Sequence, residues 1–249
     1  MLTDNTKMIP VSCSSSISLD FPYHDDPPQS GDVIHTLSQF IHELDQLYDN
    51  KESTWDDKRR NIFDLLYRTN FSTDEVNKYT FWDGEKPYTR NLIHTDGENY
   101  TLLMLCWNGG RESSIHNHPC EGCFIKTIRG CIRETRYEVH PETDEIRKSQ
   151  VKFFNEGQVS YMHDSIGLHK IGNPCKDTGS VTLHLYTPPF KSCRVWCENG
   201  PFSSAKEVKS GYFSVLGHPA PKFEGDQSCV LKDIPSHAAA FYSRRRTIN

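Results

Sequence analysis

The chain has 249 residues, of which 35% are hydrophobic and 24% charged, as is typical of a globular protein with one sizeable core. The formal net charge of -5 gives no reason to expect a nucleic-acid partner. No apolar run reaches the length of a membrane span, and residues 1–20 lack the apolar core of a secretory signal. We therefore expect a cytoplasmic protein with no membrane contact.

The N-terminal part predicts an extension followed by helices. Residues 1–31 are rich in Ser, Pro and Asp with little periodicity, which is typical of a disordered or loosely packed segment. Apolar residues from Val33 to Tyr48 recur at helical spacing, and a second helix is expected around Ile62–Leu66. The run Ser72-Thr73-Asp74-Glu75 predicts a capping box that opens a third, short helix.

From Tyr88 to about Leu216 the pattern changes to short strands separated by turns. The clearest candidates are residues 101–107, 123–137, 157–161 and 180–186. These strands predict a mainly β protein in which a few N-terminal helices pack against one small barrel. We expect one domain over residues 32–217 and a C-terminal tail over residues 218–249.

The pair His116 and His118 is the most informative feature of the chain. Alternate side chains of a strand share a face, so two imidazoles spaced i, i+2 can converge on one metal ion while Asn117 points away. A plausible third ligand is His169, in a second short element that ends in turn residues. Three neutral His ligands with open positions suit a catalytic Fe or Zn site. For an isolated His-x-His, a surface or hydrogen-bonded role is the alternative.

The predicted strand at 180–186 has two different faces. Thr182, His184 and Tyr186 share one face, while Val181, Leu183 and Leu185 share the other. We expect the apolar face to pack against the helices and the polar face to lie in the barrel lumen. A buried polar ladder that serves only the fold is the alternative.

The flanking residues add a longer pattern. Gly-x5-His-x-His-x4-Cys-x6-Gly runs from Gly110 to Gly130, and Gly157-x6-Asp164 precedes His169-x3-Asn173. This resembles the two-part signature of the cupin superfamily, a small β-barrel or jelly roll that holds one metal. The chain departs from the usual form because Cys123 stands where most cupins carry a ligand Glu.

Several further runs occur in a specific order. They carry a second, more specific resemblance, which covers roughly residues 33–217. They are Tyr88-Thr89-Arg90-Asn91, Leu105-Cys106-Trp107, Ser113 to His118, Asp164 to His169, Leu183-His184-Leu185-Tyr186 and Pro188-Pro189-Phe190. Together they resemble the animal cysteine dioxygenases.

This resemblance implies a ligand set, a substrate and a chemistry. Fe(2+) would be held by His116, His118 and His169 and would bind L-cysteine through sulfur and nitrogen, with O2 as the second substrate. The product would be cysteine sulfinate, the precursor of hypotaurine and taurine. The family also suggests a monomer that needs no organic cofactor.

The resemblance implies roles for the remaining site residues as well. Arg90 would bind the substrate carboxylate, because a buried guanidinium needs an anion and its planar fork suits a carboxylate, with Tyr88 as a supporting contact. Cys123 and Tyr186 would be joined by a thioether. Thr182, His184 and Tyr186 would form a hydrogen-bonded series that ends at the site.

Two alternatives remain open. The enzyme could act on another small thiol, cysteamine or 3-mercaptopropionate, although Arg90 argues against the amine, which has no carboxylate. The protein could also be a cupin that binds metal without catalysis.

Nine cysteines without an export signal predict mostly reduced thiols. The run Cys120-x-x-Cys123 lacks the second pair of a zinc ribbon and the βαβ context of a redox motif.

Overall fold

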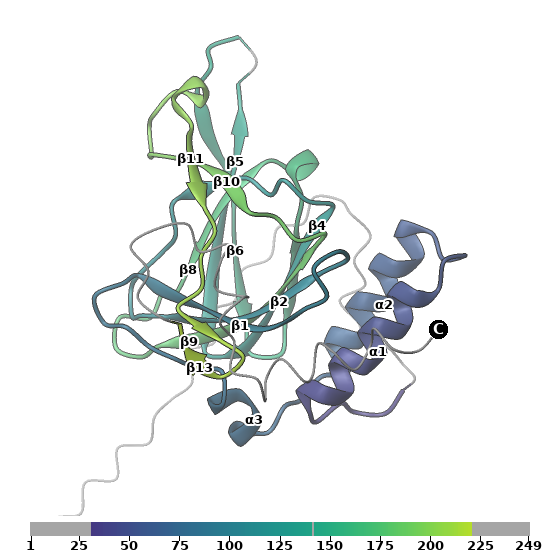
Figure 1. Cartoon of the computed structure of the whole chain (residues 1–249). Coiled ribbons are helices and arrows are strands. Elements are labelled where there is room, and N and C mark those ends of the chain that lie inside the picture. Colours follow the sequence, from purple (N-terminus) through teal and green to yellow (C-terminus); the bar gives the residue numbers. More distant parts are fainter. Residues whose placement is uncertain (1–30, 141, 221–249) are drawn as a thin grey trace, which may run out of the picture.

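The computed structural model describes residues 31–140 and 142–220, and it confirms a mainly β protein with helices at its N-terminal side (Figure 1). Most of the expected segments 1–31 and 218–249 lies outside the described residues. Within the described part, the helices are α1 (Leu37–Asp49), α2 (Trp55–Arg68) and the short α3 (Thr73–Asn77). None of these helices is long and apolar enough to cross a bilayer.

The described strands form two sheets. The first sheet has the order β13 (His218–Pro219), β12 (Ser214–Val215), β1 (Tyr88–Thr95), β2 (Thr101–Trp107), β9 (Ser180–Thr187), β4 (Gly122–Arg129), β7 (Val159–Met162). The second has the order β11 (Lys206–Lys209), β10 (Ser192–Trp196), β3 (Ile115–His116), β8 (Leu168–Gly172), β5 (Cys131–Val139), β6 (Ile146–Asn155). Two short 3-10 turns, η1 (Asp164–Ile166) and η2 (Phe202–Ser204), connect strands.

The helices begin where polar side chains can cap them. The first starts at Leu37 and not near Val33, because Thr36 accepts the Gln39 N–H and ends the extended segment before it. In the second, Thr54 and Asp57 form a complete capping box.

The capping box predicted at Ser72 is only half formed. The Ser72 hydroxyl accepts the Glu75 N–H, as expected. The Glu75 carboxylate instead accepts the Leu37 N–H at 3.2 Å and the Lys78 ammonium at 2.6 Å. Glu75 therefore ties α3 to the start of α1, which no local pattern could indicate.

The predicted strand 123–137 is two strands, β4 and β5, which lie in different sheets. The chain passes between the sheets at Gly130, whose φ of +80° favours glycine. A Cβ at Gly130 would also lie 2.6 Å from the Ser180 hydroxyl oxygen. The composition of residues 123–137 predicted one strand, so the local pattern did not reveal this break.

One apolar cluster fixes the helices to the first sheet. Phe40 and Leu44 of α1 and Ile62 of α2 pack in the same buried cluster as Leu183 and Leu185 of β9. The expected apolar face of residues 180–186 is therefore confirmed. A second cluster, which includes Leu103, Leu105 and Ile171, fills the space between the sheets. The polar face of β9 points toward this interior.

Lys126 lies under the end of α2, where it is only 4% exposed and donates to the Leu66 carbonyl at 2.7 Å. Burial lowers the pKa of its ammonium from 10.5 to about 8. Between about pH 8 and 10.5 the unfolded chain still holds this proton while the folded protein has released it, so stability rises with pH in that window. Below it, both states are protonated and the cost of burying the charge is constant.

Lys126→Met is therefore expected to increase the free energy of unfolding at pH 7, by up to about 3 kcal/mol. The Leu66 carbonyl keeps its contact with the Thr69 N–H, so the change leaves no unpaired acceptor there. Urea unfolding at pH 7 and at pH 9.5 would measure the stability of the protein with Lys126 protonated and with Lys126 neutral. The exposed Lys206→Met serves as the control. Equal pH dependence in wild type and Lys126→Met would contradict this account.

Candidate metal centre and active site

Three imidazoles meet between the two sheets. His116 ends β3 and pairs directly with His169 of β8, while His118 follows in the loop. One ring nitrogen from each residue lies within 4.8 Å of the other two, and the Nε2 atoms of His116 and His169 are 3.2 Å apart. His118 and His169 are almost completely buried. The structure therefore brings together all three residues that the sequence suggested as ligands.

Asn117 points away from the cluster and fastens the loop that carries His118. Its side-chain oxygen accepts the Arg194 N–H at 2.7 Å, and its amide nitrogen donates to Asp164 at 3.0 Å. The other oxygen of Asp164 accepts the His118 backbone N–H. Two separate chain segments, at Asp164 and Arg194, thus hold this short loop in place.

The protonation of the three rings fits a metal ion. Nδ1 of His116 faces the Ser114 carbonyl at 2.9 Å, and Nδ1 of His169 faces the Glu134 carboxylate at 2.8 Å. Both neighbours are acceptors, so each Nδ1 carries the proton and each Nε2 has a free lone pair. Burial lowers the pKa of all three imidazoles, which favours the neutral form that binds metals.

His118 adds an independent observation. Both of its ring nitrogens are buried, and neither has a hydrogen-bond partner among the described residues. A buried polar atom without a partner costs free energy, and a metal ion would satisfy Nε2. The residues present therefore fit a bound metal.

Glu134 was not anticipated from the sequence. It is fully buried, and its carboxylate also accepts from Arg136 at 2.9 Å and from the Ser160 hydroxyl at 3.4 Å. Burial raises the pKa of this carboxyl, while the adjacent Arg136 opposes the increase. An acidic residue on the inward face of a strand was the available signal, but its partner is 35 positions away along the chain.

Arg90 and Tyr186 lie beside the three imidazoles. The guanidinium of Arg90 lies 5.4 Å from the centre of the Tyr186 ring, and that ring lies 6.4 Å from the His118 ring. Arg90 Nε is buried and has no partner among the described residues. The Tyr88 ring stacks on Trp107 with centroids 4.5 Å apart.

Thr182, His184 and Tyr186 form the hydrogen-bonded series that the sequence suggested. His184 Nε2 is 2.9 Å from the Thr182 hydroxyl, and His184 Nδ1 is 3.2 Å from the Tyr186 hydroxyl. The series begins one residue earlier than expected, because the Trp107 indole N–H donates to Thr182 at 2.8 Å. Trp107 could have been found from alternation in β2, where it shares the lumen face with Leu103 and Leu105.

Cys123 stands directly opposite Tyr186 in the β4–β9 pair. Its sulfur is 3.9 Å from His184 Nδ1, and both side chains are buried. Burial raises the pKa of the Cys123 thiol and of the Tyr186 phenol, so both groups keep their protons at neutral pH. Facing positions on adjacent strands put the thiol and the ring on the same side of the sheet.

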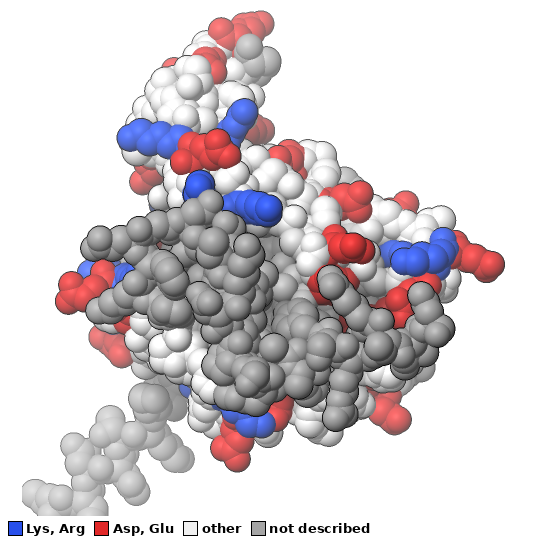
Figure 2. Space-filling view, viewed as in Figure 1, with Lys and Arg blue, Asp and Glu red and all other residues white. Residues whose placement is uncertain are grey.

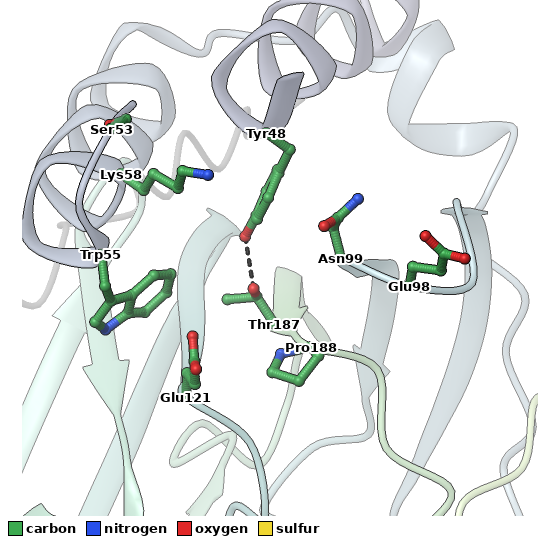
Figure 3. A pocket seen from close by; sticks show the side chains of 9 residues that line it. All are labelled: Tyr48, Ser53, Trp55, Lys58, Glu98, Asn99, Glu121, Thr187 and Pro188. Carbon is green, nitrogen blue, oxygen red and sulfur yellow. Dashed lines mark hydrogen bonds between the residues drawn. The ribbon is translucent and has the colours of Figure 1, made fainter. Parts of the chain in front are cut away.

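A separate hollow of about 280 Å³ lies behind the end of β9 (Figure 3). Its floor contains the buried hydrogen bond from Tyr48 to Thr187, 2.6 Å long, which joins α1 to the residue after Tyr186. Trp55, Lys58 and Glu121 surround it. None of the three imidazoles lines this hollow.

On the face of the molecule in Figure 2, Lys and Arg side chains lie among Asp and Glu side chains.

The fold and the site together define a two-sheet β protein with a buried three-histidine centre that can hold a metal ion. A family profile, that of cysteine dioxygenase type I, matches residues 30–199. The chain belongs to the cysteine dioxygenase type I family.

Named relatives agree with this assignment. Cysteine dioxygenase type 1 from Danio rerio is 31% identical over 75% of this chain and 90% of its own length. The Bos taurus protein is 33% identical over 65% of this chain and 78% of its own. The Rattus norvegicus protein is 38% identical over 44% of this chain, and the match spans 55%, about half, of its length.

Two solved structures show a weaker likeness, each over about half of this chain. A Klebsiella pneumoniae protein with a double-stranded β-helix domain has a TM-score of 0.37 and 14% identity, covering 49% of this chain and 95% of its own. An RmlC-like cupin from Desulfovibrio desulfuricans has a TM-score of 0.33 and 20% identity, covering 45% and 91%.

Proposed function

We propose that this protein is an iron(II)-dependent dioxygenase that oxidises L-cysteine with O2 to cysteine sulfinate. The observation that carries the proposal is the buried cluster of three neutral imidazoles beside a guanidinium whose Nε has no partner among the described residues. Membership of the cysteine dioxygenase type I family supports the substrate.

In this proposal His116, His118 and His169 would hold Fe(2+). When bound, the iron would supply the redox chemistry by which both oxygen atoms of O2 are transferred to the cysteine sulfur. Because all three ligands are neutral, an anionic thiolate is favoured at the centre.

Arg90 selects the substrate in this proposal. Its guanidinium lies over the face of the Tyr186 ring and can donate two parallel hydrogen bonds to a carboxylate. With the carboxylate at Arg90 and the thiol toward the imidazoles, the substrate is a small thiol that carries a carboxylate, which L-cysteine fits. Tyr88 supports this end of the site by packing against Trp107.

The series from Trp107 to Tyr186 orients one proton. The Trp107 N–H occupies one lone pair of Thr182, and the Thr182 hydroxyl can then donate to His184 Nε2. That leaves His184 Nδ1 protonated and able to donate to the Tyr186 oxygen. The Tyr186 hydroxyl proton is then free to point into the site, where it can stabilise developing negative charge.

We also propose the thioether between Cys123 and Tyr186, which their facing positions in β4 and β9 support. The bond joins the Cys123 sulfur to the Tyr186 ring, with loss of the S–H and one ring C–H hydrogen to O2 as the oxidant. Mass spectrometry is expected to find the two peptides joined, lighter by two hydrogens and resistant to reducing agents. Protein made without iron and kept from oxygen should lack the linkage.

Cys123→Ser serves as the matched variant for the thioether. It is expected to lose the linkage and to keep its iron, because Cys123 does not belong to the imidazole cluster. A free thiol at position 123 after many turnovers would refute the crosslink.

Product analysis tests the proposed activity. The protein is reconstituted with iron without oxygen and then given O2 with cysteine, cysteamine or 3-mercaptopropionate. We expect cysteine sulfinate as the principal product. Faster turnover of either other thiol would reassign the substrate, and no oxidation of any thiol by iron-loaded protein would favour a metal-binding cupin without catalysis.

Cytoplasmic location, a monomeric state and a place in cysteine catabolism and taurine formation remain predictions from the family resemblance. The domain limits of residues 32–217 are likewise a proposal. The strand β13 (His218–Pro219) pairs with β12, so the barrel's hydrogen bonding continues to the last described residues.

A further inference from the structure

The three imidazoles differ in the group that contacts the ring nitrogen Nδ1. His116 Nδ1 contacts a backbone carbonyl, and the ring nitrogens of His118 have no hydrogen-bond partner among the described residues. His169 alone contacts a carboxylate, that of Glu134, at 2.8 Å. In the described part of the chain, Glu134 is therefore the one acidic side chain that is hydrogen-bonded to a ring of the cluster.

Glu134 is placed rigidly enough to act through this contact. It is 0% exposed, and its two oxygens are shared among His169, Ser160 and Arg136. Arg136 is itself anchored, because it also donates to the Tyr161 carbonyl at 3.2 Å. The carboxylate cannot move away from His169 without breaking these bonds.

The charge of Glu134 matters because the cluster has none of its own. An anionic acceptor behind an imidazole fixes its tautomer and makes the opposite nitrogen a stronger donor to a metal. The buried ion pair with Arg136, at 2.9 Å, favours the ionised carboxylate of Glu134 and at the same time limits how much negative charge reaches the ring.

We infer that Glu134 is a positioning residue that sets the tautomer of His169 and, through it, the metal affinity and redox potential of the centre, with Arg136 as its opposing partner. That the metal is iron rests on the proposed function. The contact itself predicts that the Glu134 carboxylate strengthens the binding of any divalent ion that takes imidazole ligands.

The affinity of the metal-free protein for Co2+, measured by competition with a chelator, tests this inference without any turnover. Glu134→Gln keeps the size of the side chain but removes the charge, and should weaken Co2+ binding about 10- to 100-fold. The Fe(III)/Fe(II) midpoint potential should move to a more positive value in the same variant. Glu112→Gln is the matched control, because Glu112 pairs with Arg133 and Lys170 on the same sheet and contacts no imidazole.

Glu134→Gln also leaves Arg136 without its partner, so the double variant Glu134→Gln/Arg136→Gln separates folding from metal binding. It removes both charges and should still bind Co2+ weakly. Wild-type affinity in the double variant, or in a folded Glu134→Gln protein with an unchanged potential, would overturn the inference. Wild-type protein that binds Co2+ but oxidises no thiol would instead refute the proposed function and leave this inference standing.

Discussion

Replacing any one of His116, His118 and His169 with alanine is expected to remove most of the bound iron and essentially all activity. Two imidazoles cannot hold an ion as firmly as three, and the cavity left at a buried ring position admits water in place of the third ligand. Metal analysis after reconstitution and dialysis, together with oxygen consumption, would measure both effects.

The control for this series is His140→Ala. His140 directly follows β5 and lies outside the imidazole cluster, so iron content and turnover should stay at the wild-type level. Full activity with stoichiometric iron in His116→Ala, His118→Ala or His169→Ala would remove that residue from the ligand set.

Arg90→Ala is expected to lower kcat/KM for cysteine by about 30-fold or more while iron stays bound, because losing a charged partner of a buried group costs about 2 to 5 kcal/mol. The loss should appear chiefly as a higher KM. Steady-state kinetics at fixed iron loading would show it. Arg90→Lys should recover only part of the loss, since an ammonium cannot form the two parallel hydrogen bonds of a guanidinium.

Cysteamine provides the internal control for Arg90, because it lacks the carboxylate. Its kcat/KM should change far less in Arg90→Ala than that of cysteine. Equal losses for the two thiols would mean that Arg90 supports the Tyr186 ring, which it contacts at 5.4 Å, and does not select the substrate.

Local pattern was sufficient for the features that depend on neighbours in sequence. Helical spacing predicted α1 and α2, and the alternation in residues 180–186 correctly separated the face that packs on the helices from the face with Thr182, His184 and Tyr186. The spacing of His116 and His118 placed both rings on one side even though β3 ends at His116. Helical and strand periods are properties of a few consecutive residues, so they can be read without the fold.

Features that depend on pairing between distant strands were not accessible in this way. The chain crosses between sheets at Gly130, inside the run 123–137 that was expected to be one strand. Glu75 binds the start of a helix that lies 38 residues earlier, and not its own cap. Both results come from contacts that no short window contains.

The sequence by itself determined which residue types could form a metal centre and which faces of the strands would be buried, because these follow from side-chain chemistry and local backbone period. Only the tertiary structure decided that Glu134 stands behind His169, that Trp107 starts the series ending at Tyr186, and that Cys123 faces Tyr186. Those contacts depend on sheet order and strand register, which are set by packing the whole core, so a single sequence does not specify them locally.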